Sequence, residues 1–203
     1  MINAALAAYA AGCASSGYYL VRLIAGEDIR TRGSGATGAT NVGRRLGPLG
    51  FAVTFLLDCA KGAAVGWGTV HYGLDEMETS VAILAVVSGH IWPAHLSFRG
   101  GQGIATSLGA FAVYDARIVL VIASLFAFWF ILSRAFIPSG LLAYLLAPLP
   151  LIAIGLPTVR LLTVAAVAVL VVIAHGGTSA RPSPADENRR HEPTRRLTGT
   201  ADR

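Results

Sequence analysis

The sequence predicts an all-α fold, a polytopic membrane helix bundle of about seven transmembrane helices with glycine-rich cytoplasmic loops. Hydrophobic residues make up 54% of the 203 positions and charged residues only 13%, whereas soluble domains usually carry about 25% charged residues. The mean hydropathy is +0.61, and several apolar runs approach the roughly 20 residues that a helix needs to cross a bilayer. This apolar content is too high for a water-facing surface.

Apolar segments account for most of the chain. The first is rich in alanine, glycine and serine, which suits close helix packing in a membrane. The stretch 104–132 forms either one long kinked helix or two short helices that turn at residues 114–117. The expected apolar segments are residues 4–24, 49–70, 80–96, 104–132, 135–156 and 159–174.

The positive-inside rule decides between the two alternatives for residues 104–132. The loop 26–47 carries four arginines and is placed in the cytoplasm. A turn at Asp115 then gives seven spans and brings the loops at Arg99 and Arg134 to the same side as the basic tail. We therefore expect the amino terminus outside and the carboxyl terminus in the cytoplasm.

We expect a membrane domain at residues 1–175 and a basic, partly disordered cytoplasmic tail at residues 176–203. Charge and cysteine content then exclude some kinds of partner and cofactor. The net charge of +5 lies in short loops and in this tail, a distribution that does not predict a nucleic-acid partner. The two cysteines, Cys13 and Cys59, have neither a disulfide framework nor metal-ligand spacing, so no metal site is expected.

The first polar loop has the composition of an anion-binding site. Its glycines allow backbone N–H groups to wrap an anion, its hydroxyl and amide side chains add neutral donors, and its arginines can grip a phosphate. A flexible basic loop beside lipid headgroups is the simpler alternative. The residues of this predicted phosphate-binding loop are Gly33, Ser34, Gly35, Gly38, Thr40, Asn41, Arg44 and Arg45.

The same loop contains the spacing of a dinucleotide-binding motif. Gly33, Gly35 and Gly38 form a G-x-G-x-x-G pattern, and Asp58 follows 20 residues after Gly38. Such a motif requires a preceding strand in a soluble βαβ unit. Because an apolar run precedes the loop, we reject a nucleotide cofactor.

The second polar loop repeats the combination of glycine and arginine. The sequence GHIWPAHLSFRGGQGIAT places this loop at the cytoplasmic end of a span. His90 lies within that span, where it either transfers protons or holds the neighbouring loop as a hydrogen-bonding residue, and we favour the second role. The predicted phosphate-binding residues here are Arg99, Gly100, Gly101, Gln102 and Gly103.

Asp58 and Lys61 are three residues apart on one face of an apolar helix. Charges inside a span are energetically expensive and are usually paired. The two side chains either neutralise each other or brace the neighbouring loops. We favour bracing over catalysis and treat Asp58, Lys61 and His90 as structural support.

Four segments resemble those of the bacterial acyl-phosphate:glycerol-3-phosphate acyltransferase family. They are GSGATGATNVGRRLG, FLLDCAKGA, GHIWPAHLSFRGGQGIATSLG and, less specifically, RRLTGTADR, and the resemblance covers residues 18–197. It implies a seven-helix enzyme of the bacterial plasma membrane that needs no cofactor or metal. The implied reaction moves an acyl chain from acyl-phosphate to the 1-hydroxyl of glycerol 3-phosphate, giving lysophosphatidic acid and phosphate for phospholipid biosynthesis.

The resemblance also implies roles for individual residues. Ser34, Asn41 and Arg44 bind and position phosphate in the first loop, and the arginine and glycines of the second loop do the same. A substrate phosphate oxygen, in place of a protein base, takes the proton. The implied catalytic residues are Ser34, Arg44, Ser139 and His175.

The sequence departs from the family pattern at several positions. Gln102 replaces a lysine, so a cation is lost at a phosphate site, and Ala36 replaces an asparagine. Ser139 is a displaced counterpart of the family's serine after the fifth span. Either His175 or His191 corresponds to the histidine of the last motif.

These departures leave two other hypotheses open. One is a non-catalytic or altered-specificity member of the family. The other is a membrane transporter that binds phosphorylated anions, which would be expected to show polar residues deep in several spans and an internal repeat. The spans are nearly all apolar apart from Asp58, Lys61 and His90. The sequence gives no oligomeric state.

Overall fold

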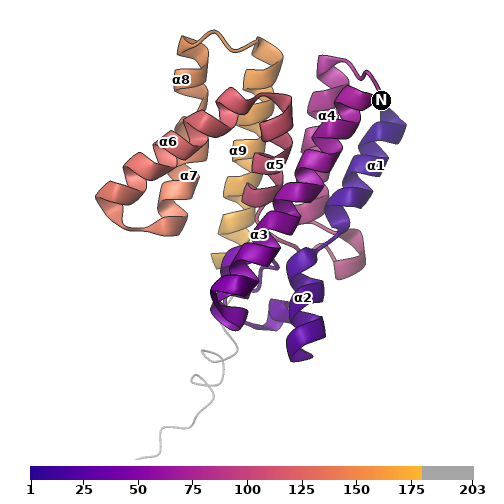
Figure 1. The fold of residues 1–203 in the computed structure, drawn as a ribbon, viewed down its shortest axis with the longest axis vertical. Helices are drawn as coiled ribbons and strands as arrows, with labels where there is room; N and C mark the ends of the chain where they lie inside the picture. The colour runs from indigo at the N-terminus through magenta and orange to yellow at the C-terminus, as the bar shows by residue number, and fades with distance from the viewer. Residues whose placement is uncertain (180–203) are drawn as a thin grey trace, which may run out of the picture.

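The computed structural model describes residues 1–179 and shows helices without strands across that range (Figure 1). The α-helices are α1 (Ile2–Cys13), α2 (Ser16–Ala25), α3 (Ala39–His71), α4 (Glu76–Ile91), α5 (Ile104–Tyr114), α6 (Ala116–Ser133), α7 (Phe136–Leu146), α8 (Pro148–Ala153) and α9 (Thr158–Ser179). Short 3-10 turns occur at Ile29–Thr31 and Ala94–Leu96. The predicted all-α class is confirmed.

Among the described residues, five helical segments are long and apolar enough to cross a bilayer. The predicted class of polytopic membrane bundle is therefore confirmed, whereas the count of seven spans stays a prediction because α5 is short and the first segment is broken. The five segments are Ala39–His71, Glu76–Leu96, Ala116–Ser133, Phe136–Ala153 and Thr158–Gly177.

The first expected apolar segment, residues 4–24, is not one continuous helix. The backbone leaves the helical region at Ala14 (φ −62°, ψ 95°) and Ser15 (φ −88°, ψ 81°), which separates α1 from α2. The carbonyl oxygen of Ala14 accepts a hydrogen bond from Lys61 Nζ at 2.7 Å. A side chain from α3 thus satisfies a polar group that the helix break exposes among apolar surroundings.

The predicted turn after residue 114 is confirmed. Asp115 adopts an extended conformation between α5 and α6, and its carboxylate accepts a hydrogen bond from the Arg117 backbone N–H at 3.0 Å. Arg160 of α9 reaches the same carboxylate at 2.7 Å. Hydrogen bonds from Arg117, and then from Arg160, hold the pKa of Asp115 well below its usual value.

The first polar loop is shorter than predicted, because α3 begins at Ala39. This helix is kinked at Gly47 (φ 80°, ψ −173°), immediately before Pro48. Only glycine adopts such a conformation readily. The residues around Arg44 therefore form a short helical arm ahead of the long part of α3.

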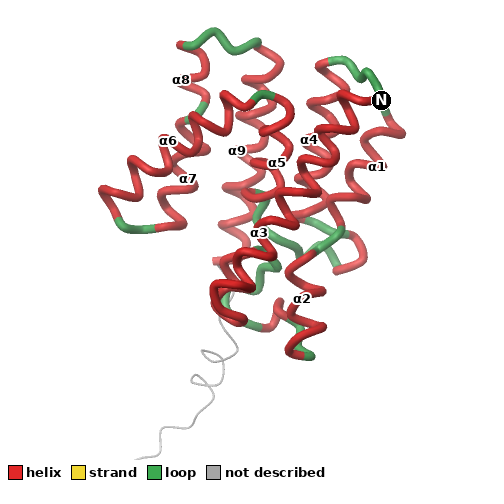
Figure 2. Tube along the Cα trace, in the orientation of Figure 1, coloured by secondary structure: helices red, strands yellow, loops and turns green. Residues whose placement is uncertain are grey.

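The amino terminus and the two glycine-rich loops lie at different ends of the bundle (Figure 1). α1 packs against α4, α3 against α5, and α6 against α7, while α9 contacts α4 and α7. The loops before α3 and before α5 lie together, and the last described residues of α9 lie at the same end (Figure 2). α9 continues past the predicted domain boundary at residue 175, and the remainder of the tail lies outside the described residues.

Close approach of α3 to α5 depends on glycine. A Cβ atom at Gly62 would collide with the carbonyl oxygen of Thr106, and one at Gly109 would collide with the carbonyl oxygen of Cys59. Small residues allow such close packing where apolar lipid removes the hydrophobic drive for association.

We predict that Gly62→Val destabilises the bundle by about 1–3 kcal/mol, since the two helices must move apart. A thermal unfolding scan in detergent would show this as a lower midpoint. Gly68→Val is the matched control, because no atom lies within 4 Å of a Cβ built at Gly68. Equal destabilisation by both substitutions would contradict this account of the packing.

Candidate functional site

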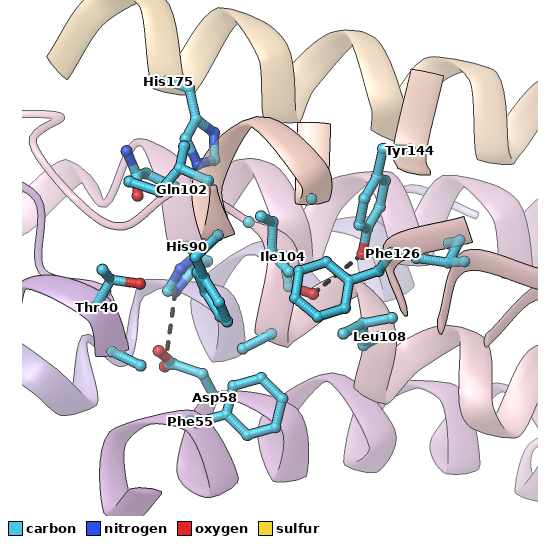
Figure 3. A pocket seen from close by; sticks show the side chains of 18 of the residues that line it. Thr40, Phe55, Asp58, His90, Gln102, Ile104, Leu108, Phe126, Tyr144 and His175 are labelled. Atoms are coloured by element: carbon cyan, nitrogen blue, oxygen red, sulfur yellow. Dashed lines mark hydrogen bonds and ion pairs between the residues drawn. The ribbon is translucent and has the colours of Figure 1, made fainter. Parts of the chain in front are cut away.

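A cavity of about 320 Å³ lies between α3, α5, α6 and α7, and its two ends differ in polarity. Thr40, Asp58, His90, Gln102 and His175 gather at one end, whereas Phe126 and Leu108 lie toward the other (Figure 3). Further apolar lining residues are Phe51, Phe55, Ile104, Val119, Ile122, Phe136 and Ile137. The cavity therefore suits a molecule with a polar head and an apolar chain.

Two helix amino termini border the polar end. Gly38 precedes α3 and Gly103 precedes α5, and both glycines line the cavity together with the first residues of their helices. The first N–H groups of a helix have no partner within it and carry partial positive charge, which favours a bound anion. Gly103 has φ 89°, which a side chain would strain.

Asn41 organises the first loop from inside. Its side chain is buried, and its amide nitrogen donates to the carbonyl oxygens of Arg32 and Ala36, each at 2.9 Å, and to that of Ile29 at 3.3 Å. Its side-chain oxygen accepts from the Ser34 backbone N–H at 3.2 Å. The side chain of Asn41 therefore holds the backbone of the first loop in place.

Backbone contacts join the two loops. The Thr37 N–H donates to the Gly100 carbonyl oxygen at 3.0 Å. Arg30 donates to the Leu96 carbonyl oxygen at 2.7 Å and also pairs with Asp28. The Arg30 guanidinium holds the pKa of Asp28 below its usual value. The loops therefore form one unit at the polar end of the cavity.

The second loop is attached to the end of α4. The N–H groups of Gly101 and Gly100 donate to the carbonyl oxygens of His90 and Ile91, at 2.9 and 3.0 Å. A Cβ atom at Gly101 would collide with the His90 ring. Glycine is therefore needed at this position for the loop to lie flat against the histidine.

A buried polar cluster supports the loops from within the bundle. Lys61 Nζ lies 2.9 Å from Asp58 Oδ1 and 2.8 Å from His90 Nδ1, and Ser16 Oγ donates to Asp58 Oδ1 at 2.6 Å. Asp58 and His90 line the cavity, with their contact drawn in Figure 3. Asp58 on α3 and His90 on α4 are buried, and Lys61 is half-buried.

The arginines of the first loop differ in their surroundings. Arg44 is exposed and lines an open hollow that shares Thr40, Phe51 and Phe136 with the cavity. Arg45 instead pairs with Glu27 at 2.9 Å and holds the pKa of that carboxyl below its usual value. Arg44 is therefore better placed than Arg45 to receive a phosphate.

Only some of the predicted site residues line the cavity or the adjoining hollow. Of the residues predicted from the sequence, Gly38, Thr40, Asp58, His90, Gln102, Gly103 and His175 line the cavity, and Arg44 lines the adjoining hollow. Arg99 is exposed at the start of the second loop, and Gly100 and Gly101 are buried in it.

Other predicted residues do not line the cavity. In the first loop and in α3 these are Gly33, Ser34, Gly35, Asn41, Arg45 and Lys61. Ser139 is fully buried in α7, where its hydroxyl donates to the Ala135 carbonyl oxygen at 2.7 Å. His191 lies outside the described residues. Within residues 1–179, no three His, Cys, Asp or Glu side chains are grouped to hold a metal ion.

The apolar wall of the cavity was not predicted from the sequence. On α6 the lining residues Val119, Ile122, Ala123 and Phe126 recur at helical spacing, so they occupy one face. A span that is apolar on all sides gives no signal that separates this face from the lipid-facing ones.

The chain is similar to acyltransferases in sequence and in fold. A family model described as Glycerol-3-phosphate acyltransferase matches residues 2–181. The "Glycerol-3-phosphate acyltransferase 1" of Desulfitobacterium hafniense (strain Y51) is 42% identical over 170 residues, which cover 84% of each chain. The "Glycerol-3-phosphate acyltransferase" of Synechococcus sp. (strain CC9902) is 39% identical over 153 residues, 75% of this chain and 72% of the relative.

A solved structure shares the fold. It is the crystal structure of PlsY (YgiH), an integral membrane glycerol 3-phosphate acyltransferase, in its glycerol 3-phosphate form. The TM-score is 0.80 at 29% sequence identity, and the match covers 88% of this chain and 89% of the other. A second structure, the lysophosphatidic acid form, gives a TM-score of 0.76 at 27% identity.

We predict that Asn41→Ala loosens the first loop, because buried carbonyl groups lose their donor at about 1–3 kcal/mol each. Limited trypsin digestion should cut after Arg32 about tenfold faster, since local opening becomes more frequent. Asn3→Ala, at an exposed position of α1, is the control and should leave the rate unchanged. An unaltered cleavage rate in Asn41→Ala would rule out this role of the asparagine.

Proposed function

This chain belongs to the glycerol-3-phosphate acyltransferase family, and we propose that it transfers a fatty acyl chain to the 1-hydroxyl of glycerol 3-phosphate. The proposed acyl donor is an acyl-phosphate, and the products are lysophosphatidic acid and phosphate. The protein is a multi-pass membrane protein, and its structural neighbour is an integral membrane protein. We further propose that the loops and the carboxyl terminus face the cytoplasm and the amino terminus faces outward, because the loops carry the arginines.

The polarity of the cavity carries this proposal. Its apolar end, with Leu108 on α5 and Phe126 on α6, matches an acyl chain. Its polar end lies at the amino termini of α3 and α5, which favour a phosphate group. An acyl-phosphate has these two parts joined at the reacting carbonyl carbon, and that carbon would lie where the two regions meet.

Positioning and electrostatics supply the proposed catalysis. The 1-hydroxyl oxygen of glycerol 3-phosphate attacks the acyl carbonyl carbon and forms the ester bond. The bond from this carbon to the phosphate oxygen breaks, and the phosphate leaves with its electron pair. A phosphate oxygen takes the hydroxyl proton, so the chemistry requires no protein base. Backbone N–H groups and an arginine stabilise the charge that develops.

Individual residues receive proposed roles from their positions. Arg44 binds a substrate phosphate in the open hollow, and Thr40 lies between that hollow and the cavity. His175 lies at the polar end, where its Nδ1 donates to the Val171 carbonyl oxygen at 2.8 Å, and its catalytic role is proposed from the family resemblance. The catalytic roles of Ser34 and Ser139 remain predictions from the family resemblance.

The decisive experiment follows phosphate release by purified protein in detergent or lipid mesophase, with palmitoyl-phosphate and glycerol 3-phosphate. Release should require both substrates and fall by about 100-fold or more in Arg44→Ala. Arg117→Ala, in the ion pairs next to Asp115, is the control and should retain activity. If folded wild-type protein released no phosphate above background, the proposed reaction would be excluded.

The glutamine of the second loop offers a separate test. Gln102 lines the polar end of the cavity, where a lysine would add a cation beside a phosphate. We predict that Gln102→Lys raises turnover several-fold, because each kcal/mol of added transition-state stabilisation is about a fivefold change in rate. Inactivity of both forms would favour a non-catalytic member of the family, and lower turnover in the lysine variant would indicate that the site is adapted to glutamine.

A further inference from the structure

The ammonium group of Lys61 contacts three different elements. It lies 2.7 Å from the Ala14 carbonyl oxygen, 2.8 Å from His90 Nδ1 and 2.9 Å from Asp58 Oδ1. An ammonium has three N–H donors and no acceptor. Simple neutralisation of Asp58 would need only the last of these contacts, so the other two require an explanation.

The contact with Ala14 holds the break between α1 and α2. This break directs α2 toward the first loop, where Gly17 packs so closely that a Cβ atom would collide with the Thr37 carbonyl oxygen. Ser16, the first residue of α2, donates to Asp58 at 2.6 Å. The lysine and its partner aspartate therefore fix the helix on which the first loop rests.

The contact with His90 reaches the second loop. Because an ammonium only donates, His90 Nδ1 is the acceptor, which sets the orientation of the ring. The ring lies against Gly101, whose N–H donates to the His90 carbonyl oxygen at 2.9 Å. The adjacent Gly100 accepts from the Thr37 N–H at 3.0 Å. One side chain is thus connected to both loops.

We propose that Lys61 is a positioning residue that holds the two phosphate-binding loops in register through the Ala14 carbonyl and the His90 ring. This role rests on the proposed function, because the loops must bind substrate phosphate for their register to matter. Lys61 itself is not among the residues that line the cavity, so it acts through its neighbours.

The proposed role has a specific kinetic signature. Without the lysine, the loops occupy the binding-competent arrangement for a smaller fraction of the time, and the apparent dissociation constant rises by the inverse of that fraction. Saturating substrate restores the arrangement, since the ligand selects it. The KM for glycerol 3-phosphate therefore rises, while kcat is largely preserved.

The test compares Lys61→Met with wild type and with Arg160→Met. Arg160 belongs to an ion-pair network with Glu76 and Asp115, so its loss reports general destabilisation. We expect the KM for glycerol 3-phosphate to rise at least tenfold in Lys61→Met with kcat within about threefold, and to stay unchanged in Arg160→Met. An unchanged KM in folded Lys61→Met, or an equal rise in both variants, would overturn the proposal.

A second pair of variants covers the risk of misfolding, because Lys61→Met leaves Asp58 buried without its cation. Asp58→Asn and the double variant Asp58→Asn with Lys61→Met differ only in the lysine. The KM for glycerol 3-phosphate should be at least tenfold higher in the double variant than in Asp58→Asn. Equal KM values in the two variants would overturn the proposal.

Limited trypsin digestion after Arg32 tests the loop register without turnover. Cleavage should be several-fold faster in Lys61→Met than in Arg160→Met, and equal rates would count against the positioning role. The digestion therefore distinguishes a failure of the proposed reaction from a failure of the proposed role of Lys61. Absence of phosphate release from wild-type protein would exclude the proposed reaction alone, while the digestion still decides whether Lys61 positions the loops.

Discussion

Inside a bilayer, a backbone N–H or C=O group that is not hydrogen-bonded within a helix needs another partner in the protein. This requirement governs the architecture. Here the first segment breaks at Ala14, and the freed carbonyl is satisfied by Lys61 from α3. The same ammonium is paired with Asp58, so its charge is compensated in a region where an isolated charge would be strongly unfavourable. A single polar cluster therefore permits both the break and the burial of ionisable groups, and the two loops are built around it.

Glycine determines how closely the elements approach one another. Gly62 and Gly109 bring α3 and α5 into backbone contact. Gly17 brings α2 against the Thr37 carbonyl oxygen, and Gly101 brings the second loop against the His90 ring. α5 packs against both α3 and α6. This close packing places the amino termini of α3 and α5 at one end of the same cavity.

The proposed reaction makes modest demands on such a site. An acyl-phosphate is already activated, so the protein must mainly hold two phosphates and an acyl chain in the correct geometry. Helix amino termini provide positive potential without a lysine, which is consistent with glutamine at position 102. The geometry of the backbone can thus accommodate a change in side-chain charge.

The sequence by itself determined the membrane environment, the helical class, the turn at Asp115 and the two glycine-rich loops, because length, apolarity and glycine spacing are local properties of the chain. Tertiary structure alone decided that residues 4–24 break at Ala14, that Asn41 and Ser139 point into the protein, and that Phe55 and Phe126 face a common cavity. The break depends on a hydrogen bond between residues 47 positions apart. The cavity wall could not be predicted because lipid and an acyl chain are chemically alike, so an apolar face carries no mark of which one it contacts.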